Sequence, residues 1–454
     1  MKMRGRRKVL RGAGPSALKW IAGGFAGIIL LGCLLLSLPC AARDGASIGW
    51  FDALFTSTSA VCVTGLVVRD TGTTFSLFGQ LVLLCLIEVG GLGFMTFATL
   101  MFRLLGREIS LRERMLIRES MNESGVGGMD QLIRWVARSA FAVQAAGALA
   151  LAVRFVPAFG WGRGMYYSVF HAVSAFCNAG FDLFGNYSSL TGFRGDVIVN
   201  VAAILLIVTG GLGFNVLRNL YERRRGGYLY LQTRIVLCTY GVLTLLGFLF
   251  VLIAEWGNPG TLGALPAGEK LMAALFQSVT LRTAGFNTIS QQALRPATKF
   301  VSGLLMLVGA SPASTGGGVK VTTLAVVLLS VRGTVRGDKG IVVFKRAVSP
   351  ELVQRALAVL LIAVGVAALD VTVISLLQPE LDFMDVVMEC TSAMGTVGLS
   401  AFGSASLSAA SRVLIILTMY LGRIGPLTMA LLLAHRQGGV ESGIEYPQGQ
   451  IMIG

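Results

Sequence analysis

The sequence predicts an all-α polytopic membrane protein built from four pseudo-symmetric units around one central pore. Three observations support this prediction: the composition, an alternation of long and half-length apolar runs, and a glycine segment that recurs four times. Of the 454 residues, 54% are hydrophobic and 13% are charged, and the mean hydropathy is +0.73. Soluble domains carry about 25% charged residues, so this composition is typical of a chain that lies mostly in lipid.

Long apolar runs predict eight spanning helices, with one shorter run between the two members of each pair. The spans are expected near 19–38, 76–101, 130–153, 196–217, 231–254, 298–329, 352–377 and 411–434. The shorter runs lie at 50–61, 164–177, 269–281 and 382–394. They are too short to span a bilayer and are candidates for re-entrant helices. The expected unit is therefore helix, pore helix, filter loop and helix.

Each half-length run leads into a short segment that ends in glycine. The segments are Val63-Thr64-Gly65, Asn178-Ala179-Gly180, Thr283-Ala284-Gly285 and Thr396-Val397-Gly398. Glycine reaches backbone conformations that allow a loop to turn its carbonyls toward one axis. Rings of such carbonyls replace the hydration shell of a cation. We therefore expect these twelve residues to form a selectivity filter.

The same pattern divides the chain into repeats and cytoplasmic segments. The expected order is an N-terminal tail (1–18), repeat 1 (19–102), a linker (103–128), repeat 2 (129–222), repeat 3 (228–331), a linker (332–348), repeat 4 (349–434) and a C-terminal tail (435–454). Basic clusters within 1–19, 103–118, 218–225 and 332–346 hold 21 of the 38 Lys and Arg residues. By the positive-inside rule these clusters and both termini face the cytoplasm. Membrane topology thus explains the net charge of +15 better than nucleic-acid binding does.

The second span of each unit carries a further glycine cluster. In units one and two, Gly90-Gly91-Leu92-Gly93 and Gly210-Gly211-Leu212-Gly213 are candidates for a helix break, but close helix packing through small residues is the favoured interpretation. In unit three the stretch is Gly309-Ala310-Ser311-Pro312-Ala313-Ser314-Thr315-Gly316-Gly317-Gly318. So much Gly with a Ser-Pro pair cannot hold a regular helix. We expect this stretch to interrupt its helix at membrane depth and to line a cavity.

Charged side chains within the apolar runs need separate explanations, because they are costly in a bilayer. Arg423 is expected either to face the pore as an electrostatic barrier or to form a salt bridge with a neighbouring helix. Lys320, just after the unit-three break, has either a gate role or a structural role. Arg282 should point away from the filter and brace its loop, with Glu389 as a candidate partner. Glu88 either lines the inner vestibule or joins a structural network.

Functions other than transport find little support. The stretch from Ser314 to Lys320 lacks the Gly-Lys-Ser/Thr ending of a phosphate-binding loop. The two histidines, His171 and His435, are far apart, and no acid, base or metal set converges, so an enzyme is not expected. The seven cysteines show neither metal-site nor disulfide spacing. Four filter segments also argue against a non-conducting scaffold.

Several motifs resemble the Trk/Ktr/HKT superfamily of cation transporters over nearly the whole chain. They are Thr58 to Leu66, Arg282 to Phe286, Ser314 to Gly318 and Gly422-Arg423-Ile424-Gly425-Pro426. Within the superfamily, the length, the eight spans and the closing residues 446–454 are most similar to KtrB-type subunits. The resemblance implies that Gly65, Gly180, Gly285 and Gly398 are the filter glycines. It also implies that 309–318 is an intramembrane gating loop and that Arg423 faces the pathway beneath the filter.

The resemblance further implies a function and partners. The implied function is potassium uptake across the bacterial plasma (inner) membrane by channel-like permeation. K⁺ is the implied substrate and Na⁺ a candidate activator, and no cofactor is expected on this chain. The expected assembly is a homodimer on a cytosolic KtrA-type ring that carries the regulatory nucleotide. Gly65 favours K⁺, because serine in the first filter segment goes with sodium transport in related plant proteins. The alternative is a TrkH-like or sodium-permeable transporter with different ion coupling.

Overall fold

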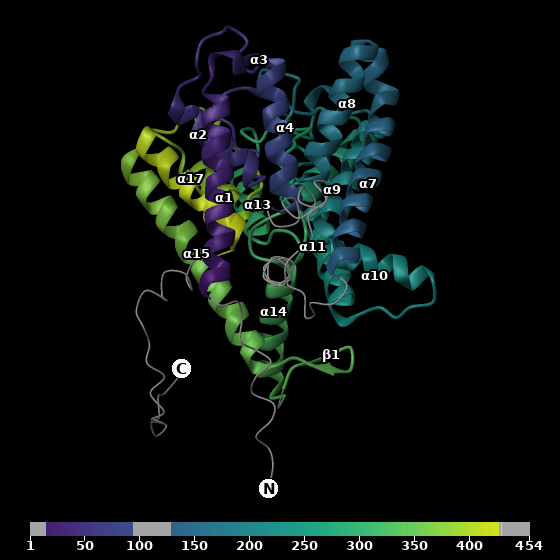
Figure 1. Ribbon diagram of the computed structural model, residues 1–454. Coiled ribbons are helices and arrows are strands. Elements are labelled where there is room, and N and C mark those ends of the chain that lie inside the picture. Colours follow the sequence, from purple (N-terminus) through teal and green to yellow (C-terminus); the bar gives the residue numbers. More distant parts are fainter. Residues whose placement is uncertain (1–14, 94–128, 339, 426–427, 429–454) are drawn as a thin grey trace.

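The computed structural model describes residues 15–93, 129–338, 340–425 and 428, and within them the chain is an all-α bundle with one small hairpin (Figure 1). This confirms the all-α part of the predicted fold class. The predicted 103–128 linker, the predicted C-terminal tail and residues 94–101 of the second expected span lie outside the described residues. Of the predicted N-terminal tail (1–18), the structure describes only residues 15–18.

Long and short helices alternate along the chain. The first predicted repeat holds α1 (Pro15–Leu36), α2 (Trp50–Val61), α3 (Thr71–Thr74) and α4 (Leu77–Leu92), and the second holds α7 (Met129–Phe159), α8 (Trp161–Phe176), α9 (Val197–Leu212) and α10 (Phe214–Arg224). The third holds α11 (Leu231–Glu255), α12 (Ala267–Thr280), α13 (Pro296–Leu307) and α14 (Val321–Arg336), followed by β1 (Val342–Val343) and β2 (Arg346–Ala347). The fourth holds α15 (Pro350–Leu377), α16 (Phe383–Gly395) and α17 (Ala409–Ile424). Single 3-10 turns lie at Pro39–Ala41, Thr191–Phe193 and Ser404–Ser406.

The first helix of each predicted repeat is the long one. Among the described residues, α1, α7, α11 and α15 are long and apolar enough to cross a membrane, and the bent pair α9 and α10 could supply a fifth span. The protein is thus a multi-pass membrane protein. Within the described residues, the second helix of each predicted repeat is interrupted or ends early, so these expected spans are not single continuous helices.

Glycines in the left-handed region end three of these second helices. Gly93, Gly213 and Gly425 cap α4, α9 and α17 with φ of +82°, +87° and +102°. Residues with a Cβ rarely adopt this conformation. The interpretation of the first two clusters as packing glycines was therefore incomplete. Gly90 and Gly210 do pack against backbone carbonyls, but the helix also ends within each cluster.

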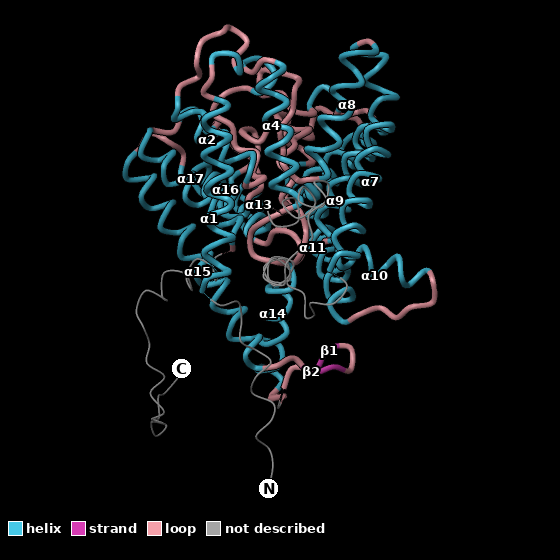
Figure 2. The backbone as a smooth tube through the Cα atoms, in the orientation of Figure 1, coloured by secondary structure: helices cyan, strands magenta, loops and turns pink. Residues whose placement is uncertain are grey.

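The short helices lie inside the bundle and the long ones outside it. Nine of the 13 residues of α16 are buried, against five of the 28 residues of α15. Figure 2 shows irregular segments in the interior, enclosed by helices. Unpaired backbone is tolerated at membrane depth only in such a protein-lined position. The half-length apolar runs are therefore internal helices that lead into internal loops.

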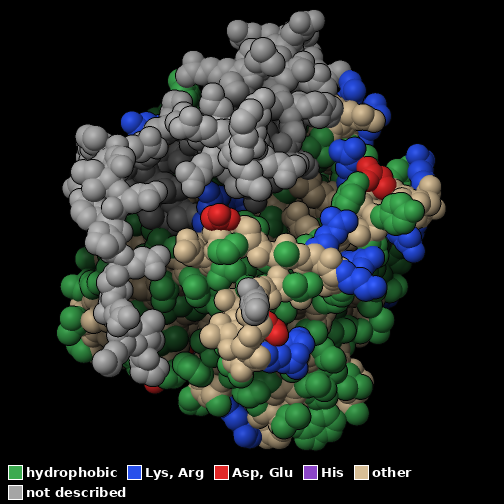
Figure 3. Space-filling view, turned by 90° about the horizontal axis from the view of Figure 1, so that it is seen from below, with side chains coloured by type: hydrophobic (Ala, Val, Ile, Leu, Met, Phe, Trp, Pro, Cys, Tyr) green, Lys and Arg blue, Asp and Glu red, His purple; other side chains and the backbone are tan. Residues whose placement is uncertain are grey.

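The described basic segments share one face of the molecule. α10, the end of α14 and the β1–β2 hairpin all lie at the lower side in Figure 1. Seen from below, Lys and Arg side chains gather toward the right, the side on which Figure 1 places α10 and β1 (Figure 3). This common placement agrees with the positive-inside argument for residues 218–225 and 332–346.

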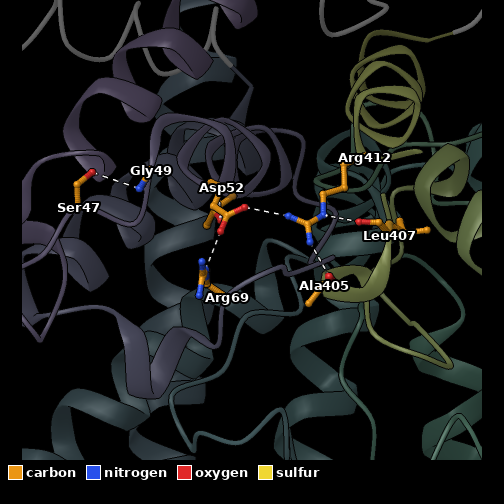
Figure 4. A network of polar contacts seen from close by, with 8 residues as sticks. Ser47, Gly49, Asp52, Arg69, Ala405, Leu407 and Arg412 are labelled. Carbon is orange, nitrogen blue, oxygen red and sulfur yellow. Dashed lines mark hydrogen bonds and ion pairs between the residues drawn. The ribbon is translucent and has the colours of Figure 1, made fainter. Parts of the chain in front are cut away.

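Asp52, in the first turn of α2, joins the first and the last predicted repeats (Figure 4). Its carboxylate accepts hydrogen bonds from Arg69 Nε at 2.7 Å and from Arg412 Nη1, at the start of α17, at 3.0 Å. Arg412 also donates to the carbonyls of Ala405 and Leu407. The Asp52 side chain is 13% exposed and that of Arg412 18%, so this pair is shielded from water. One carboxylate therefore ties together two segments that are 360 residues apart.

We predict that Asp52→Asn lowers the free energy of unfolding by about 1–3 kcal/mol, because it weakens charge-assisted hydrogen bonds to two guanidinium groups. A thermal melt of the purified protein in detergent would show a lower transition temperature. Asp44→Asn is the matched control, since exposed Asp44 accepts only a local bond from the Ala46 N–H. Equal melting of both variants and the parent would contradict the role given to Asp52.

Candidate functional site

The four short helices direct their C-terminal ends at the four glycine segments. α2, α8, α12 and α16 end three to five residues before Gly65, Gly180, Gly285 and Gly398, respectively. The C-terminal end of a helix carries the negative end of its dipole, which favours a cation beyond it.

The four glycine segments share one unusual backbone path. In each, the first residue has a positive φ although it carries a side chain: Val63 (55°), Asn178 (58°), Thr283 (66°) and Thr396 (52°). The glycine also has a positive φ, between 70° and 96°, and the residue between them does not. Left-handed non-glycine residues are costly and gather at functional sites. Because this unfavourable backbone conformation occurs at the equivalent position of all four segments, it indicates that the four segments share one function.

The segments contact one another in a closed ring, in chain order. A Cβ atom added to each glycine would collide with, or press tightly against, the carbonyl oxygen of the middle residue in the next segment. The pairs are Gly65 with Ala179 (2.5 Å), Gly180 with Ala284 (3.0 Å), Gly285 with Val397 (2.6 Å) and Gly398 with Thr64. The structure therefore brings together all four predicted segments, which are spread over more than 330 residues of sequence.

A cavity opens onto this ring. Its volume is about 500 Å³, and Gly65, Gly180, Gly285 and Gly398 all line it. Asp70 and Asp182 lie in the same lining and bring two carboxyl groups. Neither aspartate was predicted from the sequence as a site residue. The available sequence signal was an acidic residue five positions after the first filter glycine, Gly65, and another two positions after the second, Gly180.

Hydroxyl groups of the short helices hold the segments in place. The Ser59 and Ser392 hydroxyls each accept from a glycine N–H at 3.0 Å, whereas the Ser174 hydroxyl donates to the Phe181 carbonyl at 2.7 Å. In the third segment Thr280 donates to the Phe286 carbonyl instead. Sequence reasoning missed these residues, although a serine stands six residues before the glycine in three of the four segments.

A loop of residues 308–320, between α13 and α14, lies directly against two glycine segments. The Gly317 N–H donates to Thr396 Oγ1 at 3.0 Å, and a Cβ at Gly316 would collide with the Thr283 side chain. The Thr315 hydroxyl donates to the Phe176 carbonyl at the end of α8. The predicted interruption of the third-repeat helix is thus observed, and it lies where the glycine segments meet.

The same loop is bonded to the broken ends of α9 and α17. The N–H groups of Ser311 and Thr315 donate to the carbonyls of Gly211 and Gly210, and that of Gly318 donates to Gly422. Ala313 in turn accepts from the Phe214 N–H at 2.9 Å. These bonds satisfy backbone groups that the helix breaks leave unpaired, as burial in a bilayer requires.

Two basic side chains, those of Arg423 and Lys320, form hydrogen bonds to carbonyls of the 308–320 loop. Arg423 donates to the Thr315 carbonyl and to the Gly90 carbonyl of α4, and so bridges the loop to another repeat. Lys320 Nζ donates to the Gly316 carbonyl at 2.7 Å. Within the described ranges, Arg423 forms no ion pair, so the salt bridge with a neighbouring helix is not observed there. Its partners are backbone carbonyls, which become available because both segments leave helical geometry.

Arg282 braces the chain behind its segment, but not through Glu389. Its guanidinium donates to the Val308 carbonyl at 2.9 Å, where α13 ends. Buried Glu389 accepts instead from the Ser404 hydroxyl. The expected pairing of the two is thus wrong, because each finds a polar partner closer to its own segment. Glu88 accepts from Gln144 and from the Cys177 thiol, which favours the structural network over a place in the vestibule.

Comparison with known proteins identifies the family. The family model described as TrkH, cation transport protein, matches residues 28–442. The chain belongs to this family. It is 41% identical over 445 residues to the Ktr system potassium uptake protein B of Bacillus subtilis (strain 168), covering 96% of this chain and 98% of that one. Identity to the Ktr system potassium uptake protein B of Vibrio alginolyticus is 37%, covering 99% and 97% of the two chains.

The fold is shared with a solved transporter. The crystal structure of the potassium transporter TrkH from Vibrio parahaemolyticus superposes with a TM-score of 0.69 at 18% identity, covering 94% of this chain and 86% of that one. The family model and the two Ktr relatives confirm the superfamily expected from the sequence motifs. Its relatives are transport proteins and not enzymes.

Arg423 offers a test of the loop. We predict that Arg423→Ala raises basal cation flux in vesicles, because it removes both a positive charge and the bridge between Thr315 and Gly90. Arg423→Lys keeps the charge but a single ammonium cannot reproduce the planar fork of the guanidinium, so an intermediate flux is expected. Unchanged cation flux in Arg423→Ala, with normal expression and folding, would show that Arg423 is not part of the barrier.

Proposed function

We propose that this chain takes up potassium across the bacterial plasma membrane by channel-like permeation. The observation that carries the proposal is the closed ring of four glycine segments. In it, the carbonyls of Thr64, Ala179, Ala284 and Val397 each stand beside the glycine of a neighbouring segment. Such carbonyls would take the place of the water around a dehydrated cation. The names of the two Ktr relatives support potassium as that cation.

In this proposal the cavity that holds Asp70 and Asp182 is the outer entrance. Negative charge there would raise the local concentration of cations before they enter the ring. The four repeats, with the boundaries expected from the sequence, would surround a single pore. The shared order of long helix, short helix and glycine segment supports this division of the chain.

The 308–320 loop is proposed as the gate on the inner side. Its position against Thr283 and Thr396 supports this role, as do the cations of Lys320 and Arg423 that lie with it. Movement of the loop would have to break its bonds to α9, α17 and Arg423. A signal from outside the membrane could supply that change.

We further propose that this signal comes from a cytosolic KtrA-type ring that binds a nucleotide and carries a homodimer of this chain, with Na⁺ as an activator. The names of the two relatives refer to a Ktr system, and the described basic segments share one face. That face would be cytoplasmic, and both termini would lie on the same side.

Growth of a potassium-uptake-deficient bacterium on low potassium tests the function. Expression of this chain together with a regulatory subunit should restore growth, and the rescue should depend on whether Na⁺ is present. Restored tracer uptake of Na⁺ without K⁺ would overturn potassium uptake in favour of the sodium-permeable alternative. The empty vector and the chain without its partner are the controls.

Gly65→Ser tests the ring. Because Gly65 has a φ of +90° and lies against the Ala179 carbonyl, a side chain must displace that carbonyl. We predict that the ratio of K⁺ to Na⁺ uptake falls by about tenfold, which corresponds to roughly 1.4 kcal/mol of lost discrimination.

Gly45→Ser is the control for this substitution. Gly45 also has a positive φ, of 71°, but a Cβ there meets no atom within 4 Å. It should leave the uptake ratio unchanged. If the ratio of K⁺ to Na⁺ uptake is also unchanged in Gly65→Ser, with normal surface expression, the first glycine segment is not part of the filter.

A further inference from the structure

α10 leaves the direction of the spanning helices. The chain turns by 99° between α9 and α10, at Gly213. α10 buries Phe214, Val216 and Asn219 and ends with Arg223 and Arg224 in its last turn. A short amphipathic helix with arginines on its polar face, set across the spanning helices, is typical of the membrane–water interface.

Two neighbouring cavities lie at the start of α7. The described lining of the first belongs to α7 alone, and the second lies between α7 and α10. One, of about 410 Å³, is lined by Gln131, Arg134, Trp135 and Arg138. The other, of about 360 Å³, shares Gln131 and Trp135 with the first and adds Arg218, Tyr221, Glu222, Arg225 and Gly227. The two cavities are named here the α7–α10 cleft, and none of their described lining residues belongs to the glycine ring.

The α7–α10 cleft carries an excess of positive charge. Four arginines line it, against one glutamate, and Glu222 is already paired with Arg218 at 2.9 Å. Within the described part of the chain, Arg134, Arg138 and Arg225 have no acidic partner, although Arg225 stacks on the Tyr221 ring at 4.5 Å. Arginines without an acidic partner, grouped beside two aromatic rings, can bind phosphate oxygens through their planar donor groups.

The surroundings of the cleft fit a lipid rather than a soluble anion. Tyr228 and Tyr230, just after α10, are 84% and 61% exposed, as aromatic side chains in an interfacial belt are. Large apolar side chains are exposed along the neighbouring spanning helices, including Phe141 and Leu149 of α7 and Leu205 of α9. Acyl chains could lie on this surface while the headgroup occupies the cleft.

We propose that the α7–α10 cleft binds the headgroup phosphate of an anionic phospholipid from the leaflet that faces the basic segments. Basic pockets between spanning helices on the cytoplasmic side are suited to this class of ligand. The site lies close to the proposed gate, since Phe214 at the start of α10 donates its N–H to the Ala313 carbonyl.

The test uses the purified full-length protein and a double variant, Arg134→Gln with Arg225→Gln, which removes one unpaired arginine from each cavity. Native mass spectrometry and a lipid titration would measure binding of phosphatidylglycerol and of phosphatidylcholine. Each arginine removed should weaken phosphatidylglycerol binding by about fivefold, or about 25-fold for the pair. Phosphatidylcholine binding should not change.

The matched control is Arg332→Gln with Arg336→Gln, which removes the same charge from exposed positions at the end of α14 on the same face. It should keep phosphatidylglycerol binding within about twofold of the parent, since it leaves the cleft intact. Equal losses in both double variants would show general attraction to the basic face and would overturn the site.

A second measurement on the parent protein does not depend on the folding of a variant. Inorganic phosphate should fail to displace phosphatidylglycerol from the protein. Displacement by inorganic phosphate, or equal retention of phosphatidylglycerol and phosphatidylcholine through delipidation, would overturn the assignment to an anionic lipid.

Discussion

Close backbone contact within the glycine ring is the constraint on which the rest of the structure depends. Each of four glycines leaves no room for a Cβ beside a carbonyl of the next segment. Four segments from distant parts of the chain can meet this closely only if each short helix delivers its segment at the same depth and angle. The buried short helices, their hydroxyl groups and the Asp52 link between the first and last predicted repeats all serve that placement.

A second requirement follows from the first, because the ring and the 308–320 loop place irregular backbone inside a membrane protein. Their N–H and carbonyl groups cannot turn to water and must find partners in the protein. They find them in the broken ends of α9 and α17, in Thr396, and in the cationic groups of Lys320 and Arg423. The helix breaks and the loop therefore complement each other.

The sequence predicted the fold class, the four glycine segments and the third-repeat interruption, because repeated glycines at near-equal spacing are a local signal with a clear backbone meaning. It left open whether the helices break at Gly93 and Gly213, since a glycine cluster serves close packing and helix ending equally well. The partners of Arg282 and Arg423 also could not be predicted. They are backbone carbonyls, such as those of Val308 and Thr315, which carry no sequence signature.

The central claim is that the ring of Thr64, Ala179, Ala284 and Val397 carbonyls holds the transported cation. The most direct measurement is an experimental structure of the protein in K⁺, repeated with Tl⁺ as a strongly scattering substitute. The account predicts density for the ion on the axis of the ring, beside these four carbonyls. Density elsewhere in a transport-active preparation, with none inside the ring, would contradict it.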